Sequence, residues 1–285
     1  MGNVVITCDS TCDLTPELYQ KYQIQPIALS IYLGEQVYKD QIDVTVPDLF
    51  AYADRERVLP RTTAISVGEY MDVFSAIRET GNEVVHISLS NQFSSCYQNA
   101  TIAAKEVGGV YTVDSLNLSS GSGHLAVLAA ELRDQGLSGA EIASQLEEAR
   151  TRLDVSFVLQ TLDYLRMGGR CSGVAALGAN LLKLRPEILV TSEGTMVVGK
   201  KYRGDMKRTI SDYIKGRLAG RDDVQLNRIF ITYSAGIPDE DIEEFKALVA
   251  SLQPFEEIIT TNAGCTIASH CGPKCLGVLF FRKKA

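Results

Sequence analysis

The chain has 285 residues, 45% of them hydrophobic and 22% charged, with a formal net charge of -7 and a pI near 5.1. This composition is typical of a globular protein, and the acidic balance argues against nucleic-acid or anionic-membrane binding, which favours basic faces. The first residues, MGNVVITCDSTCDL, lack the basic start of a signal peptide, and no apolar run is long enough to span a membrane. We therefore expect a cytoplasmic protein without membrane insertion, whose seven cysteines are reduced thiols.

Short apolar segments alternate with helical patterns along the first half, which predicts a largely parallel sheet flanked by helices. The first strand is expected at residues 3–8, and Thr15 followed by Pro16 marks the start of the first helix. The remaining predictions are a hairpin of 24–33 with 36–40, helices at 45–55, 68–79 and 138–153, and strands at 83–90 and 109–114 that each lead into a helix. Ser138, with Glu141 at the capping-box position, marks the start of the helix at 138–153.

The pattern changes near residue 153. The second half predicts a strand at 155–161, two short helices over 162–182, a hairpin of 185–191 with 195–203, strands at 228–235, 256–264 and 275–282, and a helix at 238–252. The change predicts two α/β domains in contact across a cleft. Residues 1–153 would hold the mostly parallel sheet and 154–285 a mixed α/β structure.

A polar run, SLSNQFSSCYQNAT at 88–101, stands where a strand should turn into a helix. A helix N-terminus has unpaired N–H groups and a partial positive charge, so it attracts anions. The Ser94 hydroxyl and the backbone N–H of Ser95 could both donate to such an anion. The alternative is that Ser94 only caps its own helix.

A second hydroxyl cluster, RTTAIS at 61–66, is expected in a loop before a helix, and His270 lies near the C-terminus. Thr62, Thr63 and Ser66 are either further donors or ordinary helix caps. Neutral donors of this kind suit a carboxylate better than a phosphate, for which Arg and Lys would be expected. His270 is either a ligand of that carboxylate or a core residue.

Other chemistries have weaker support in the sequence. The spacing of a zinc site drawn from Cys265, His270, Cys271 and Cys275 matches no common structural site, so no metal is expected. The glycine pattern GSGHLA at 121–126 is separated from its strand, unlike a dinucleotide loop, and G-x-S-x-G is absent from the sequence. Catalysis of acyl or phosphoryl transfer by His270 or Cys96 remains an alternative.

Six segments, taken in order and spacing, make the chain resemble the DegV family from end to end. They are ITCDSTCDL (6–14), LPRTTAIS (59–66), SLSNQFSSCYQNA (88–100), VDSLNLSSGSG (113–123), LDYLRMGGR (162–170) and SHCGPKCLGVLFF (269–281). The resemblance implies a two-domain, non-enzymatic protein that binds a long-chain fatty acid such as palmitate, stearate or oleate. It also implies a partner, a fatty acid kinase that makes acyl phosphate for phospholipid synthesis.

The resemblance assigns the carboxylate of that fatty acid to Thr62, Ser94, His270 and the N–H of Ser95. It associates Arg170 and Arg203 with the kinase-facing surface. The chain departs from the family pattern where Ser95 replaces Gly, Cys96 and Cys271 replace Thr, and Ala64-Ile65 replaces Gln-Pro. None of these changes removes a proposed ligand.

Elementary energetics agree with a fatty acid. A sixteen-carbon chain offers about fifteen apolar groups at about 0.8 kcal/mol each, or about 12 kcal/mol before ordering costs. The polar site need only supply enough hydrogen bonds that the carboxylate of the head group is not buried unpaired. We expect a monomer whose tunnel is lined by apolar residues of the first domain. An alternative is a regulatory module that binds another carboxylic acid.

Overall fold

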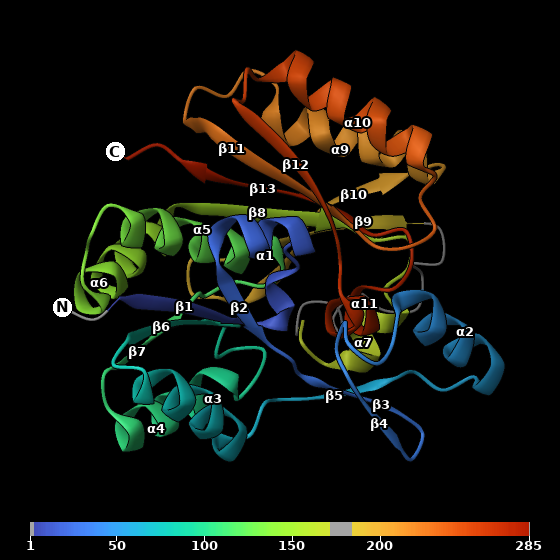
Figure 1. Cartoon of the computed structure of the whole chain (residues 1–285). Coiled ribbons are helices and arrows are strands. Elements are labelled where there is room, and N and C mark those ends of the chain that lie inside the picture. Colours follow the sequence, from blue (N-terminus) through green and yellow to red (C-terminus); the bar gives the residue numbers. More distant parts are fainter. Residues whose placement is uncertain (1–2, 172–183, 285) are drawn as a thin grey trace.

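The computed structural model describes residues 3–171 and 184–284. Its helices and sheets form five layers, in the order helix, sheet, helix, sheet, helix (Figure 1). The second of the two short helices predicted over 162–182 falls mostly outside the described residues. Within the described part of the chain, no helix combines the length and the apolar character needed to cross a bilayer.

The first sheet is parallel and has the strand order β2-β1-β6-β7. Its strands are β1 (Val4–Asp9), β2 (Ile24–Ile27), β6 (Glu83–Ser88) and β7 (Val110–Asp114). One face is covered by α3 (Val67–Glu79) and α4 (Cys96–Val107), and the other by α1 (Pro16–Tyr22), α5 (Ser120–Asp134) and α6 (Gly139–Ala149). The side chains of Thr15, Ser66 and Ser138 cap α1, α3 and α6, as the local sequence predicts for such helix starts.

The second sheet is mixed, with the strand order β10-β9-β8-β13-β11-β12. Only the pair β11–β12 is parallel among these neighbours. The strands are β8 (Leu153–Val158), β9 (Leu184–Val190), β10 (Met196–Arg203), β11 (Val224–Tyr233), β12 (Glu257–Asn262) and β13 (Leu276–Arg282). Helices α9 (Met206–Leu218) and α10 (Asp239–Leu252) form the outermost layer on this side (Figure 1).

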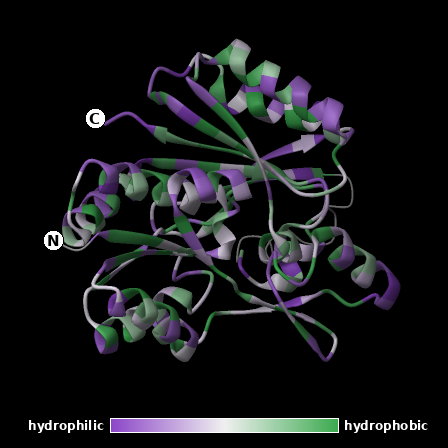
Figure 2. Ribbon diagram, viewed as in Figure 1, coloured by the Kyte–Doolittle hydropathy of each residue, from purple (hydrophilic) through white to green (hydrophobic). Residues whose placement is uncertain are grey.

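Helix α5 lies between the two large sheets and is buried along most of its length. A Cβ on Gly121 would lie 2.3 Å from the Asn117 side chain, and one on Gly123 would lie 2.7 Å from the Cys12 carbonyl oxygen. The glycines of GSGHLA therefore allow close packing inside a helix and do not form a phosphate loop. Figure 2 shows hydrophobic residues along the central strands, whereas the outer helix α10 alternates between hydrophobic and hydrophilic positions.

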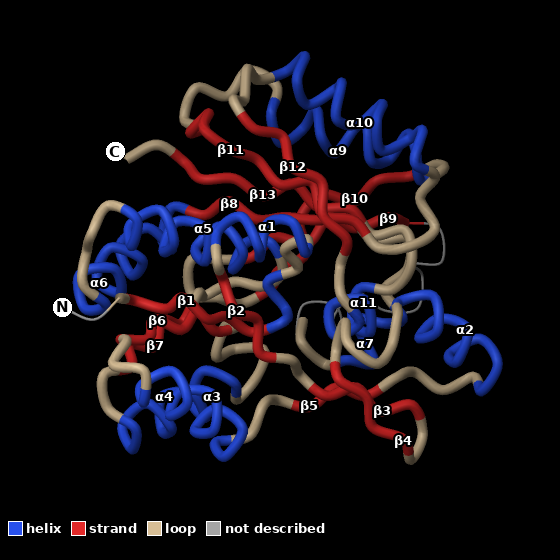
Figure 3. The backbone as a smooth tube through the Cα atoms, viewed as in Figure 1, coloured by secondary structure: helices blue, strands red, loops and turns tan. Residues whose placement is uncertain are grey.

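A third, small sheet with the order β4-β3-β5 stands beside the main layers, next to two short helices (Figure 3). Its strands are β3 (Ser30–Leu33), β4 (Gln36–Lys39) and β5 (Arg61–Thr63), and α2 (Val46–Glu56) connects β4 to β5. The nearby helices are α7 (Asp163–Gly168) and α11 (Cys265–Cys271).

The predicted hairpin turn at 34–35 is confirmed, but two predictions in this region are wrong. Residues 24–33 form two strands, β2 and β3, because the chain leaves the parallel sheet after Ile27 and enters the small sheet at Ser30. Residues 61–63, expected in a loop, form β5 because their backbone pairs with β3. Three residues are too few to show an alternating pattern.

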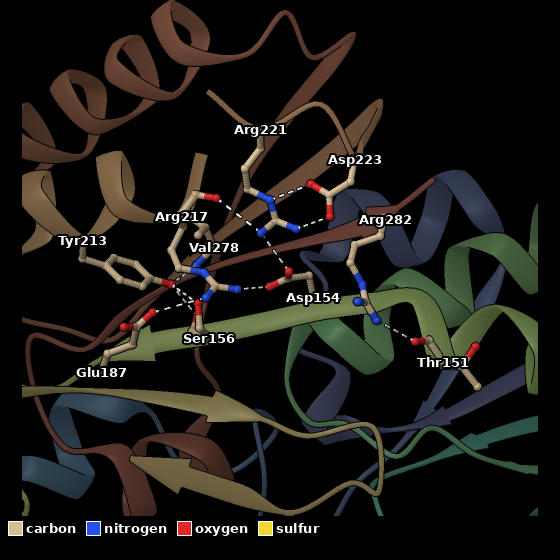
Figure 4. Close-up of polar contacts among 10 residues, drawn as sticks. All are labelled: Thr151, Asp154, Ser156, Glu187, Tyr213, Arg217, Arg221, Asp223, Val278 and Arg282. Atoms are coloured by element: carbon tan, nitrogen blue, oxygen red, sulfur yellow. Dashed lines mark hydrogen bonds and ion pairs between the residues drawn. The ribbon is translucent and has the colours of Figure 1, made fainter. Parts of the chain in front are cut away.

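A network of charged side chains fastens α9 to the second sheet (Figure 4). Asp154 on β8 accepts hydrogen bonds from Arg217 and from Arg221, the latter at 2.9 Å. Arg221 also pairs with Asp223 at 2.6 Å, and Arg217 lies 3.6 Å from Glu187. Each arginine thus has acidic neighbours, so the network is structural and offers no vacant anion site.

The predicted fold class is confirmed: a parallel sheet flanked by helices, followed by a mixed α/β half. The division at residue 153 stays a prediction. The hydrophobic core around α5 includes Val85 and Ile87 from the first sheet and Phe230 and Leu279 from the second, so the two halves share apolar packing.

Candidate functional site

A partly open pocket lies at the junction of the N- and C-terminal halves, and its non-protein space, with space open to solvent included, is about 610 Å³. Its lining comes from the small sheet, the loops after β2 and β6, and the segment before α5, together with β8, α7, β10 and α11. The residues are Leu29, Thr62, Thr63, Ala64, Leu89, Phe93, Ser94, Leu118, Phe157, Leu165, Arg170, Met196, Thr266, Ile267, His270 and Cys271. Besides the N-terminal half, β8, β10 and α11 line this pocket, while the expectation of a tunnel lined by apolar residues of the first domain stays a prediction.

A second, mainly apolar space adjoins the first, between the segment before α5, α11 and the second sheet, and its non-protein space, with space open to solvent included, is about 380 Å³. The two spaces share Leu118, Phe157, Ile267 and Cys271 as lining residues. Beyond these, the second space is bounded by residues such as Val155, Gly277 and Leu279. The two spaces therefore lie next to each other and meet at the four shared side chains. The sequence did not single out Leu118 or Phe157, since apolar residues next to strands are usual core positions.

Two of the predicted site residues meet at the cavity wall. The Thr62 hydroxyl oxygen on β5 lies 3.0 Å from Nε2 of His270 on α11, although the residues are 208 positions apart. Ser94, in the loop before α4, lines the same cavity. The structure therefore gathers Thr62, Ser94 and His270 around one space.

Two buried acids hold α11, and thus His270, against the N-terminal half. Asp40 accepts hydrogen bonds from the N–H groups of Cys265 and Thr266, and Asp13 accepts one of 2.9 Å from the N–H of Gly264. A carboxyl at a helix N-terminus satisfies N–H groups that have no partner within the helix. Burial raises the pKa of both acids, well above the usual range for Asp13. Sequence reasoning missed this pair, because a cap supplied by a remote residue leaves no local pattern.

The imidazole of His270 is neutral at neutral pH. Burial, assisted by the positive charge of Arg170, lowers its pKa to about 4. Its Nδ1 atom is buried and has no hydrogen-bond partner among the described residues. His270 is thus neither an ordinary core histidine with both nitrogens satisfied nor a standing positive charge.

Ser94 lies one residue before the N-cap of α4, satisfies the first N–H of this helix and also lines the cavity, so the two interpretations of the sequence are compatible. Its hydroxyl oxygen accepts a hydrogen bond of 3.2 Å from the N–H of Cys96 and donates to the Cys96 sulfur. Ser95 occupies the N-cap position of α4 with φ of -80°. It is exposed and is not one of the residues that line the cavity. A φ of -80° is open to any residue, so the absence of the family glycine does not strain this turn.

Cys96, which bonds Ser94, is the nucleophile that one form of the transferase alternative would require. Burial raises the pKa of the Cys96 thiol to about 12, with the carboxylate of Asp9 as the second cause. A thiol held protonated in this way is a poor nucleophile.

The two arginines associated with a kinase-facing surface lie in different places. Arg170 is exposed at the cavity, and its Nε and Nη1 donate to the carbonyl oxygens of Phe93 and Gly168 at 3.4 and 2.5 Å. Arg203 is exposed at the far end of β10 from the cavity-lining Met196. Seven residues of strand separate Arg203 from Met196, roughly 23 Å.

The remaining histidines and cysteines form structural contacts. His86 bonds Thr7 at 2.9 Å and lies 3.3 Å from Asp9 in a fully buried group, while His124 bonds the Leu279 carbonyl at 2.9 Å. Within residues 3–171 and 184–284, no group of three or more His, Cys, Asp or Glu side chains could hold a metal ion. Cys265 donates to the Val44 carbonyl, so it does not share a ligand set with His270.

Comparison with known proteins identifies the family of this chain. The model described as "uncharacterised protein, DegV family" matches residues 3–283. A DegV domain-containing protein of Caldanaerobacter subterraneus is 33% identical over 99% of this chain and 100% of its own length.

Solved structures agree along the whole chain. A DegV family protein from Thermus thermophilus, described by its fatty acid binding, superposes with a TM-score of 0.86 and 27% identity over 98% of this chain and 99% of its own. A stearic acid-binding protein from Eubacterium ventriosum gives a TM-score of 0.83 and 26% identity over 99% of each chain. The chain therefore belongs to the DegV family.

Proposed function

We propose that the chain binds a long-chain fatty acid. The acyl tail occupies the two adjoining apolar spaces, and the carboxylate is held by the hydroxyls of Thr62 and Ser94, by His270 and by the N–H of Ser95. The observation that carries this proposal is the hydrogen bond between Thr62 and His270 at the wall of a mainly apolar cavity. The fatty acids bound by the relatives from Thermus thermophilus and Eubacterium ventriosum support it.

The physical chemistry of the site supports a carboxylate of this kind. Apolar burial of the tail provides the affinity, at about 0.8 kcal/mol for each methylene. The head group lies among neutral donors, with the guanidinium of Arg170 at the same cavity as a further source of positive potential. A buried carboxylate with two or more donors avoids most of its desolvation cost.

The proposal extends to a partner. The protein has no catalytic turnover of its own, and as a cytoplasmic monomer it presents the bound carboxylate to a fatty acid kinase. Arg170 lies beside the carboxylate end, whereas Arg203 would mark a second point of contact on an extended docking face. The resulting acyl phosphate would serve phospholipid synthesis.

Extraction of the purified protein tests the binding step. Protein expressed in a bacterial host is extracted with organic solvent, and the extract is analysed by mass spectrometry. We expect a fatty acid of sixteen or eighteen carbons at near one per chain. Absence of any fatty acid, together with no uptake of added palmitate or oleate, would refute the proposal. Acyl phosphate formed from ATP without a kinase would instead support the transferase alternative.

A further inference from the structure

The C-terminal end of α7 packs directly on the imidazole of His270. A Cβ on Gly168 would lie 2.4 Å from Nδ1 and 3.2 Å from Cε1 of that ring. The distance of 2.4 Å is shorter than real Cβ contacts allow, so the ring would have to move. Gly169 then reverses the chain with a left-handed φ of +68°, which returns Arg170 to donate to the Gly168 carbonyl. Only glycine at 168 leaves room for the ring where it stands.

This contact constrains which ring nitrogen carries the proton. Because the ring is neutral at pH 7, one nitrogen is protonated and the other has a lone pair. A proton on Nδ1 would face an aliphatic Cα, since Nδ1 is buried and has no hydrogen-bond partner within residues 3–171 and 184–284. A lone pair on Nδ1 can instead accept a weak Cα–H contact from Gly168. A buried N–H without an acceptor is the less favourable of the two arrangements.

The position of the proton decides what Thr62 can do. With the proton on Nε2, His270 donates to the Thr62 hydroxyl oxygen across 3.0 Å, and the Thr62 proton is left to point into the cavity. With the proton on Nδ1, Thr62 must donate to Nε2 and would turn an oxygen lone pair towards a carboxylate. The first arrangement makes Thr62 a donor to an anion, whereas the second makes it repulsive.

We propose that Gly168 is a positioning residue that fixes His270 in the tautomer protonated at Nε2, so that His270 acts on the ligand through Thr62. His270 thus directs the Thr62 hydroxyl and need not itself touch the carboxylate. This inference rests on the proposed function for its effect on binding. The tautomer itself is a property of the protein without ligand.

The tautomer is measured first, in lipid-free protein labelled with ¹⁵N. Long-range ¹H–¹⁵N correlation spectra at pH 7.5 separate protonated from unprotonated imidazole nitrogens for the three histidines. The signals that disappear in the His270→Gln variant are those of His270. We expect a proton on Nε2 and none on Nδ1. A proton on Nδ1, or a charged ring, overturns the inference whether or not the protein binds fatty acid.

A double-mutant cycle then tests the action through His270. Gly168→Ala should weaken oleate binding by about tenfold or more in the native background, but by less than about twofold on the His270→Ala background. Equal losses in both backgrounds would mean that the glycine serves packing alone.

Gly68→Ala is the matched control, because a Cβ there meets nothing within 4 Å on the exposed face of α3. If native protein binds no oleate, the proposed function fails while the tautomer result stands. If Gly168→Ala does not fold, the spectra decide alone.

Discussion

Replacing Thr62 by valine removes one hydroxyl and preserves the shape of the side chain. The only hydrogen bond of that hydroxyl among the described residues runs to His270, so Thr62→Val removes this bond and one proposed donor to the ligand. A hydrogen bond to a charged group contributes about 1.5–3 kcal/mol. Since about 1.4 kcal/mol corresponds to a factor of ten, oleate affinity should fall by about 10- to 150-fold.

The variant should also lose stability, but for a different reason. His270 Nε2 keeps its partly buried position and loses its only partner in the part of the chain that the structure describes, which costs about 1–3 kcal/mol in the free energy of unfolding. Where His270 acts on the ligand through Thr62 alone, this cost is common to free and bound protein and does not enter the affinity.

Calorimetric titration of lipid-free protein with oleate measures the affinity, and urea unfolding measures the stability. Thr101→Val is the control, because the Thr101 hydroxyl bonds the Tyr97 carbonyl on α4, away from the cavity lining. If Thr62→Val binds oleate within a factor of two of the native chain, the carboxylate does not lie at Thr62.

Three further predictions concern stability and the rival enzyme. Burial raises the folded-state pKa of Asp13 above its unfolded value, so the folded protein binds more protons between these two values and stability falls as pH rises through that window. Asp13→Asn should make urea unfolding less pH-dependent and should stabilise the protein above that window, whereas an unchanged slope would contradict the raised pKa of the buried Asp13 carboxyl. Cys96→Ser should retain fatty acid on purification, since the thiol is protonated at neutral pH; complete loss would indicate a role for the thiolate. Asp154→Asn should lower the free energy of unfolding by about 3 kcal/mol, because Arg217 loses its closest acid, while oleate affinity remains native; an unchanged urea midpoint would refute the structural role.

Local patterns predicted the elements that depend on nearby residues. Thr15 with Pro16, and Ser138 with Glu141, correctly marked helix starts, because a cap and its partner lie within one turn. Alternation of apolar strands with helices similarly predicted the parallel sheet. These features need no knowledge of the rest of the chain.

Elements that depend on remote partners were not predictable in this way. Strand β5 exists through pairing with β3, and α11 begins where Asp13 and Asp40 satisfy its N–H groups. The proximity of Thr62 to His270 came from resemblance to the DegV family, since nothing in either segment points to the other. Phe157 on β8 lines both apolar spaces, and this position likewise depends on how β8 packs against the N-terminal half.

A crystal structure of the protein loaded with oleate tests the central claim most directly. The account predicts a carboxylate within hydrogen-bond distance of the Thr62 and Ser94 hydroxyls, with the hydrocarbon chain passing Leu118 and Phe157 into the second apolar space. A carboxylate bound elsewhere, or a chain that leaves both spaces empty, would contradict it.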